Sequence, residues 1–294
     1  MFRLSKQALL AASAALLMCG CASLKPGWTE LPPAAGNQDS SAQVARAEAL
    51  FRDADTQEKL SEVIAAYAVA LELDSDNYEI LVGLCETHIL EAAAYASSKK
   101  EKKTGYRLGI GYCDRAMYTN PEFRDLVDRG VSLGDAVGTL TEREAKAMIL
   151  WVTGVSYYFK ECLGGISRLY SYRLIMRTEP FLDRMMEIDP DYLNGVVHFS
   201  RGIYYLGLPK FAGGDRELSA ELMNRAEEVG PDSMLVRWGR AKYYYFETND
   251  RGGFERDLRW VVQQDPRESS TPYAWNVYFQ RDGITLLENV EQLF

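Results

Sequence analysis

Five similar segments divide this chain, and each ends in a stop rich in Asp, Asn or Pro. In each segment a large apolar residue is followed three positions later by a smaller or more flexible residue. An example is Leu182 and Met185 before Asp189-Pro190. This spacing places both residues on one face of a helix, and proline cannot continue a helix. Strand-like alternation is absent, apart from short aromatic runs such as Tyr243–Tyr245 that also fit a buried helix. The pattern therefore predicts an all-α fold.

The helix ends resemble the tail of a tetratricopeptide repeat. The stops fall at positions 75, 121, 190, 231 and 266, so they are 46, 69, 41 and 35 residues apart, against about 34 residues in a strict repeat. Such repeats stack because none buries its apolar face alone, and stacking leaves a concave or central surface. We predict degenerate tetratricopeptide-like helical repeats that form a compact bundle or superhelix over residues 43–294, with an insertion before the third stop.

The N-terminus predicts export. Arg3 and Lys6 precede an apolar run from Ala8 to Met18 that only Ser13 interrupts. This run is too short to span a bilayer, but it has the length of a signal-peptide core. We predict a signal peptide over residues 1–20.

A lipid anchor is predicted directly after that signal. Gly20 precedes Cys21, which resembles the bacterial lipobox, where the chain is cut before the cysteine and its thiol is lipidated. An ordinary secretory signal with incidental cysteines is the alternative. Residues 22–42 are rich in Pro, Gly and Ser, so we expect residues 21–42 to form a lipidated flexible tether. Membrane contact would then occur through the lipid alone.

The net charge argues against a nucleic-acid-binding protein, and the cysteines argue against a small disulfide-rich fold. The net charge is −9, and it becomes −11 without the first twenty residues, because 31 bases then face 42 acids. A surface of this sign repels nucleic acid, and the basic cluster at 99–103 is read as a solvated helix start or loop. Three distant cysteines, Cys85, Cys113 and Cys162, do not form a dense disulfide framework. One pair could form, but buried free thiols are the preferred expectation.

No catalytic, metal or cofactor motif appears in the sequence. The chain has two histidines, His88 and His198, and no His- or Cys-rich spacing of the kind that holds structural zinc. There is no GxSxG elbow, P-loop or complete dinucleotide motif. We predict a protein that is not an enzyme and needs no cofactor, with His88 packed in the core.

One long loop stands out, at positions 208–215. Asp215 is placed to cap the following helix, and Gly213-Gly214 permit left-handed backbone angles before it. A structural loop is one interpretation. The other is that Lys210 and Phe211 border a binding surface, since loops on one face of a repeat array often carry the site.

Four segments resemble the T-component (TatT) lipoproteins of TRAP transporters, the tripartite ATP-independent periplasmic systems. The resemblance covers about residues 43–294 and is most specific over 192–215. It is carried by Tyr192, Gly195, His198, Gly202, Tyr204 and Tyr205; by Pro209 and Phe211 to Asp215; by Ala241, Tyr243 and Tyr244; and by Glu144, Ala145, Ala147, Trp151 and Gly154 of a central helix.

The resemblance implies a lipid-anchored periplasmic protein that assembles into a ring-shaped homotrimer. Each protomer would hold a cleft or pore, bind the solute-receptor subunit of the transporter, and handle a hydrophobic ligand. Ala22 and Ser23 follow Cys21 in place of an aspartate, which slightly favours the outer membrane. The chain's 5 Trp, 18 Tyr and 11 Phe suit an aromatic-lined pocket, although repeat cores absorb aromatics too.

We place the partner or ligand surface on aromatic residues of the central helix and on the long loop. The candidates are Trp151, Tyr157, Tyr158, His198, Lys210 and Phe211. The alternative is that the first three pack the repeat core. Two other functions remain open at this point: a scaffold lipoprotein for envelope assembly, and a helical hydrolase acting on glycans through paired carboxylates.

Overall fold

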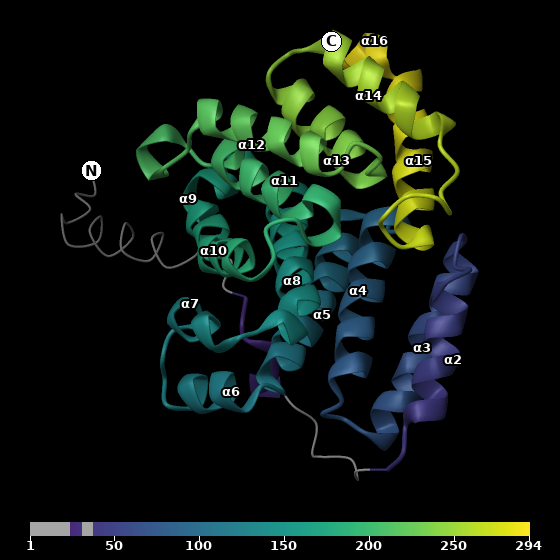
Figure 1. The fold of residues 1–294 in the computed structure, drawn as a ribbon, viewed down its shortest axis with the longest axis vertical. Coiled ribbons are helices and arrows are strands. Elements are labelled where there is room, and N and C mark those ends of the chain that lie inside the picture. Colours follow the sequence, from purple (N-terminus) through teal and green to yellow (C-terminus); the bar gives the residue numbers. More distant parts are fainter. Residues whose placement is uncertain (1–23, 31–37) are drawn as a thin grey trace, which may run out of the picture.

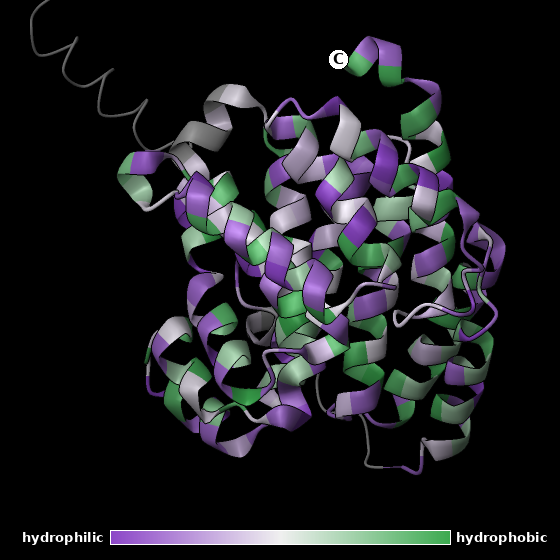
Figure 2. Cartoon of the chain, turned by 45° about the horizontal axis from the view of Figure 1, so that its top comes forward, coloured by the Kyte–Doolittle hydropathy of each residue, from purple (hydrophilic) through white to green (hydrophobic). Residues whose placement is uncertain are grey.

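The computed structural model describes residues 24–30 and 38–294, and every regular element in this part of the chain is a helix, without a strand. The all-α prediction is therefore confirmed. The predicted signal peptide and the lipidation site Cys21 lie outside the described residues. None of the described helices has the length and apolar character needed to cross a membrane. Figure 2 shows both hydrophilic and hydrophobic residues on the visible helices, as helices that bury one face require.

The first half of the chain is built around α4 (Tyr78–Ala94), α5 (Lys99–Tyr118) and α8 (Ala145–Tyr157). These helices lie side by side, and α4 is buried along most of its length (Figure 1). The elements around them are η1 (Gly27–Glu30), α2 (Ser41–Phe51), α3 (Gln57–Leu73), α6 (Pro121–Asp128), α7 (Leu133–Ala136), η2 (Val137–Thr139) and η3 (Glu142–Glu144).

In the second half, helices that follow one another in the chain pack against each other. The helices α14–α16 lie at the end of the molecule away from α6 (Figure 1). It begins with the π-helical turn η4 (Tyr158–Cys162) and contains a second π-helical turn, η6 (Arg240–Tyr245). The other elements are α9 (Gly165–Met176), α10 (Glu179–Ile188), α11 (Tyr192–Gly207), η5 (Lys210–Ala212), α12 (Arg216–Val229), α13 (Met234–Gly239), α14 (Arg251–Gln263), α15 (Tyr273–Glu288) and α16 (Val290–Leu293).

Four of the five predicted stops fall between helices, and the fifth, position 121, is the first residue of α6. At two of them an asparagine caps the next helix. The side chain of Asn77 accepts hydrogen bonds from the amides of Glu79 and Ile80 at the start of α4. Asn120 caps α6 in the same way, directly before Pro121. Cap and proline chemistry therefore set these boundaries.

A disulfide joins α4 to α5, between Cys85 and Cys113, whose Cα atoms are 5.2 Å apart. The expectation of free thiols is wrong for this pair, while Cys162 is free and buried as predicted. The reason is the close approach of the two helices. Gly105, Gly109 and Cys113 share one face of α5, and a Cβ atom on Gly109 would lie 2.6 Å from the Ile89 side chain and 3.0 Å from the Cys85 carbonyl.

The start of α11 has an unusual backbone. Leu193, Asn194 and Gly195 have φ angles of 48°, 53° and 91°, in the left-handed region that side chains rarely adopt. A Cβ atom on Gly195 would lie 2.4 Å from the carbonyl oxygen of Ala226. This glycine therefore lets the first turn of α11 lie directly against the end of α12.

Residues 24–30 are not part of a flexible tether, so that prediction is wrong for this stretch. Leu24 is buried, and the Trp28 ring stacks on Tyr118. The segment packs against α5 because a glycine at position 27 allows its backbone to touch that helix.

Candidate functional site

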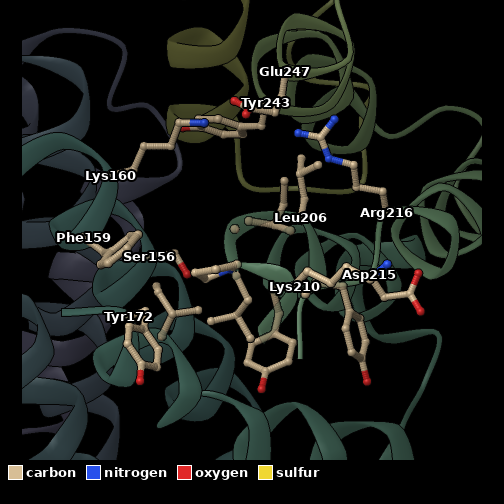
Figure 3. Close-up of a pocket in the computed structure, with 18 of the residues that line it drawn as sticks. Ser156, Phe159, Lys160, Tyr172, Leu206, Lys210, Asp215, Arg216, Tyr243 and Glu247 are labelled. Carbon is tan, nitrogen blue, oxygen red and sulfur yellow. The ribbon is translucent and has the colours of Figure 1, made fainter. Parts of the chain in front are cut away.

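A cleft of about 830 Å³ opens on the side of the second half. Its walls come from four places in the chain: the end of α8 with η4, the helix α9, the α11–α12 connection, and η6 with the residues that follow it (Figure 3). The lining residues are Ser156, Phe159, Lys160, Gly165, Tyr172, Ile175, Ile203, Tyr204, Tyr205, Leu206, Gly207, Leu208, Pro209, Lys210, Gly214, Asp215, Arg216, Glu217, Tyr243 and Glu247.

The α11–α12 loop at one edge of this cleft is closed by backbone hydrogen bonds from residues 212–214 to the carbonyls of Pro209 and Lys210. Gly213 has a φ of 94°, and a Cβ atom on Gly214 would lie 2.0 Å from the Leu208 carbonyl oxygen. The Asp215 carboxylate accepts hydrogen bonds from the amides of Glu217 and Leu218, each at 3.0 Å. The cap at Asp215 and the left-handed glycine at 213 are therefore confirmed.

Lys210 and Phe211 lie in the turn η5 of this loop. Phe211 is 77% exposed, the largest value among the exposed large hydrophobic residues described. Its ring makes an edge-to-face contact with Tyr172 of α9, with 5.7 Å between centroids. Lys210 is exposed and lines the cleft. The loop thus presents one aromatic ring and one cation at the cleft edge.

Two π-helical turns face each other across the opposite end of the cleft. Lys160 from η4 places its ammonium 4.6 Å from the centroid of the Tyr243 ring from η6 (Figure 3). A π-helical turn inserts one residue into a helix and is frequent at functional sites. Sequence reasoning missed Lys160, Tyr172 and the role of Tyr243, because nothing in a helical pattern marks where a π turn will form.

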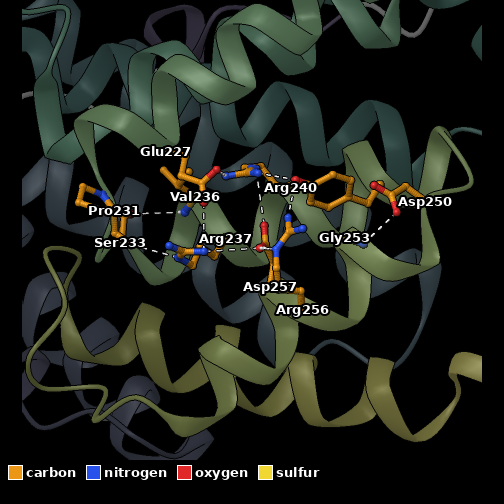
Figure 4. A network of polar contacts seen from close by, with 11 residues as sticks. Glu227, Pro231, Ser233, Val236, Arg237, Arg240, Asp250, Gly253, Arg256 and Asp257 are labelled. Carbon is orange, nitrogen blue, oxygen red and sulfur yellow. Dashed lines mark hydrogen bonds and ion pairs between the residues drawn. The ribbon is translucent and has the colours of Figure 1, made fainter.

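A buried ion network holds η6 in place (Figure 4). Arg240 lies between two carboxylates: it pairs with Glu227 of α12 and lies 3.6 Å from Asp257 of α14. Arg237 contacts the same two acids, at 3.2 and 3.5 Å. Burial raises the pKa of Asp257, and the surrounding guanidinium groups oppose that effect. Charges buried together in this way require partners, so the network fixes the turn that carries Tyr243.

Tyr243, which lines the cleft, has two further buried tyrosines, Tyr157 and Tyr278, as neighbours. Burial raises the pKa of Tyr157, Tyr243 and Tyr278 well above the ordinary value. The nearby Tyr106 hydroxyl donates a hydrogen bond of 2.8 Å to Glu161, which also pairs with Lys102 at 2.7 Å. These phenols remain protonated at neutral pH, so they act as packing groups and hydrogen-bond donors rather than as bases.

The predicted site residues fall into two groups in the structure, one buried and one exposed. Trp151, Tyr157 and Tyr158 are buried, so the prediction that they form an interaction surface is wrong, and the alternative of core packing holds. The Trp151 ring stacks on Phe181 with 4.4 Å between centroids. Aromatic rings contribute most when fully removed from water, and a helix packed on several sides buries them.

His198 is also buried and does not line the cleft. Its Nε2 lies 3.5 Å from an Asp191 oxygen, and its Nδ1 has no hydrogen-bond partner among the described residues. Of the predicted interaction residues, only Lys210 and Phe211 therefore lie at the surface. No group of three His, Cys, Asp or Glu side chains in the described part is arranged to hold a metal ion.

These features define an all-α protein with a lateral cleft and a loop that exposes an aromatic ring. The family model of the TRAP transporter T-component (TAtT) matches residues 95–294, and the chain belongs to this family. Membership gives it an accessory role in a TRAP transporter. No curated protein matches the chain.

Proposed function

We propose that this chain is a lipoprotein, anchored in the periplasm through Cys21, that binds the solute-receptor subunit of its transporter and takes up an apolar or amphipathic ligand. The observation that carries the proposal is the cleft of about 830 Å³ bordered by the loop of Lys210 and Phe211. Homotrimer formation is part of the proposal through the family resemblance, and an outer-membrane location through Ala22 and Ser23, which follow Cys21 in place of an aspartate.

The loop has the features of a protein-binding surface. An exposed aromatic ring that enters a pocket on a partner can contribute much of the binding free energy. Because backbone hydrogen bonds within residues 209–214 and the Asp215 cap hold the loop in this conformation, less conformational entropy would be lost on binding. Lys210 beside the ring favours an acidic patch on the receptor.

The cleft has the features of a ligand site. Aromatic and aliphatic residues such as Phe159, Tyr172 and Ile203 form its walls. The charged residues of the lining are of both signs: Lys160, Lys210 and Arg216, and Asp215, Glu217 and Glu247. Ligand sites typically combine apolar walls with a few polar groups that orient the ligand. The arrangement therefore suits a molecule with an apolar body and a polar head group.

Filling the cleft tests ligand binding. Gly207 lines it and has open space around its missing side chain, so Gly207→Trp should occupy the cleft without disturbing the core. Gly138 also has open space but lies outside the lining, which makes Gly138→Trp the matched control. With the fluorescent fatty acid cis-parinaric acid as probe, we expect saturable binding in the control and its loss in Gly207→Trp. Equal binding by both variants would remove the cleft from the proposal.

Anchoring and assembly need separate tests. Cys21→Ser should leave an exported species that no longer fractionates with membranes as a mature protein, because its thiol is the proposed lipid site. Sedimentation equilibrium of the chain without residues 1–21 should give a trimer. A monomer there would remove the trimer alone, and membrane-bound mature Cys21→Ser would remove the anchor alone.

A further inference from the structure

The segment that follows the proposed lipid site is fixed to the body of the protein. The Gly27 amide donates a hydrogen bond of 2.8 Å to one oxygen of Asp114, and the Trp151 indole N–H donates one of 2.8 Å to the other. Asp114 itself is buried. A carboxylate in the core is therefore shared between the central helix and this segment, which we call the docked segment (residues 24–30).

Packing supports the same contact. The Trp28 ring stacks on Tyr118 at 5.5 Å and meets Phe123 edge-on at 5.9 Å. Inside the segment, the Thr29 amide and hydroxyl both donate to the Pro26 carbonyl, at 3.1 and 2.8 Å. The segment thus has its own closed turn and an aromatic contact on each side of the α5–α6 junction.

Gly27 makes the close approach to α5 possible. A Cβ atom at this position would lie 2.0 Å from the carbonyl oxygen of Gly111. Since the obstacle is backbone, it cannot move aside as a flexible side chain would. Any side chain at position 27 must therefore displace the docked segment.

Docking shortens the distance between the lipid and the fold. If residues 22–42 were free, their 21 residues would give a root-mean-square reach of about 25 Å and a contour of about 70 Å. With Leu24 docked, only Ala22 and Ser23 separate it from Cys21, and the three steps from Cys21 to Leu24 span at most about 11 Å. That length is comparable to the polar interfacial layer of one leaflet, which is roughly 5–8 Å thick.

We propose that the docked segment holds the anchored protein against the membrane, with the face formed by residues 24–30, the end of α5 and α6 turned toward the lipid head groups. This inference rests on the lipidation of Cys21 proposed above. α6 carries exposed charges such as Glu122, Arg124 and Asp125, so it lies against the head groups and does not insert. The end that carries α16 points away from the membrane (Figure 1).

Two labelled positions test this orientation. A fluorophore on Glu122→Cys reports the α6 end, and one on Gln292→Cys reports the α16 end; both positions are exposed. The native Cys85 and Cys113 are bonded and Cys162 is buried, so they do not compete for the label. The lipidated chain is placed in vesicles of phosphatidylethanolamine and phosphatidylglycerol that contain a lipid with a spin-labelled head group. We expect strong quenching at position 122 and little at position 292.

Releasing the segment should remove this difference. Gly27→Ala creates the backbone clash and should bring the two probes to similar quenching, whereas Lys25→Ala, at an exposed position of the same segment, should leave the difference intact. Trp28→Ala is a second releasing variant, and melting temperature shows whether each variant stays folded. Hydrogen exchange on the chain without residues 1–21 tests docking alone: the Gly27 amide should exchange more than about tenfold slower than the same site in Trp28→Ala.

The outcomes separate this inference from the anchor. If the chain is membrane-bound through Cys21 and the two probes are quenched equally, the orientation is wrong while the anchor stands. If the Gly27 amide exchanges its hydrogen as fast in the parent protein as in Trp28→Ala, residues 24–30 are not docked, whether or not Cys21 carries a lipid. If mature Cys21→Ser stays on membranes, the anchor fails and the orientation argument fails with it.

Discussion

The central helix α8 and the α11–α12 loop both carry aromatic residues, but the two regions place them in opposite environments. Trp151 of α8 is 2% exposed, with its ring on Phe181 and its indole N–H on Asp114. Phe211 of the loop is 77% exposed and touches Tyr172 by an edge. A buried ring contributes to folding free energy, while an exposed ring contributes little to it. The loop ring therefore points to binding, and the helix ring to stability.

The largest expected effect is the loss of the buried ring. Trp151→Ala would leave a cavity beside Phe181 and remove one donor from Asp114. Truncation of a buried tryptophan typically costs about 3–5 kcal/mol, so the melting temperature should fall by roughly 10 °C or more. Thermal unfolding followed by circular dichroism measures this.

Trp151→Phe is the matched control for that experiment. It keeps a six-membered ring against Phe181 and removes the pyrrole part of the indole with its N–H donor, so its cost should be clearly smaller. A melting temperature for Trp151→Ala within a few degrees of the parent protein would show that α8 does not depend on this ring, and the comparison between the two regions would fail.

The next effect concerns the charge buried beside Trp151. Burial raises the pKa of Asp114 to about 7, although the donors Gly27 and Trp151 and the more distant Arg177 lower it. The folded chain therefore binds this proton more tightly than the unfolded chain does. The stability due to neutral Asp114 is fully present below about pH 4 and is lost as the pH rises through about 7. The size is on the order of a few kcal/mol.

Urea unfolding at a series of pH values measures this dependence. Asp114→Asn cannot titrate at this position, so its free energy of unfolding should show a flatter profile between about pH 4 and 7. Since the amide also changes the hydrogen bonds to Gly27 and Trp151, the slope is compared rather than the absolute stability. Identical slopes in both proteins would show that Asp114 titrates normally.

The same contrast explains what the sequence could predict. The helix ends were predictable because Asn77, Asn120 and the prolines act locally, within one turn of the chain. The cap at Asp215 was predictable for the same reason. Exposure of an aromatic ring depends on which helices pack around it, and a single helix pattern does not contain that information. Trp151 and Phe211 therefore looked alike as candidates.

Other features depend on contacts between distant segments. The Cys85–Cys113 disulfide follows from glycines that let α4 and α5 approach closely, and these glycines looked like ordinary helix positions. Docking of residues 24–30 depends on Asp114, about ninety residues away, while their composition is that of a linker. The cleft needs π-helical turns in two different helices, which no spacing rule predicts.

A smaller effect on stability is expected at the N-terminal end of α11, in the first turn of the helix. Gly195→Ala places a side chain at a φ of 91° and a Cβ atom 2.4 Å from the Ala226 carbonyl. Strain of this kind costs about 1–3 kcal/mol. Gly207→Ala, where nothing lies within 4 Å, is the control and should be neutral or slightly stabilising. Equal melting temperatures for the two variants would show that the left-handed start of α11 is not required.

The smallest effect on stability, and the largest on binding, is expected in the loop. In the double variant Lys210→Ala and Phe211→Ala, both side chains are exposed, so the free energy of unfolding should change by less than about 0.5 kcal/mol. Affinity for the solute receptor of the same transporter should fall about tenfold or more, as expected for the loss of an aromatic anchor. Isothermal titration calorimetry measures this, with Ile284→Ala as the control because Ile284 is also apolar and 46% exposed but lies on α15. Unchanged affinity in the double variant would remove the loop from the binding surface. A large fall in its melting temperature would instead give Phe211 the structural role that its exposure argues against.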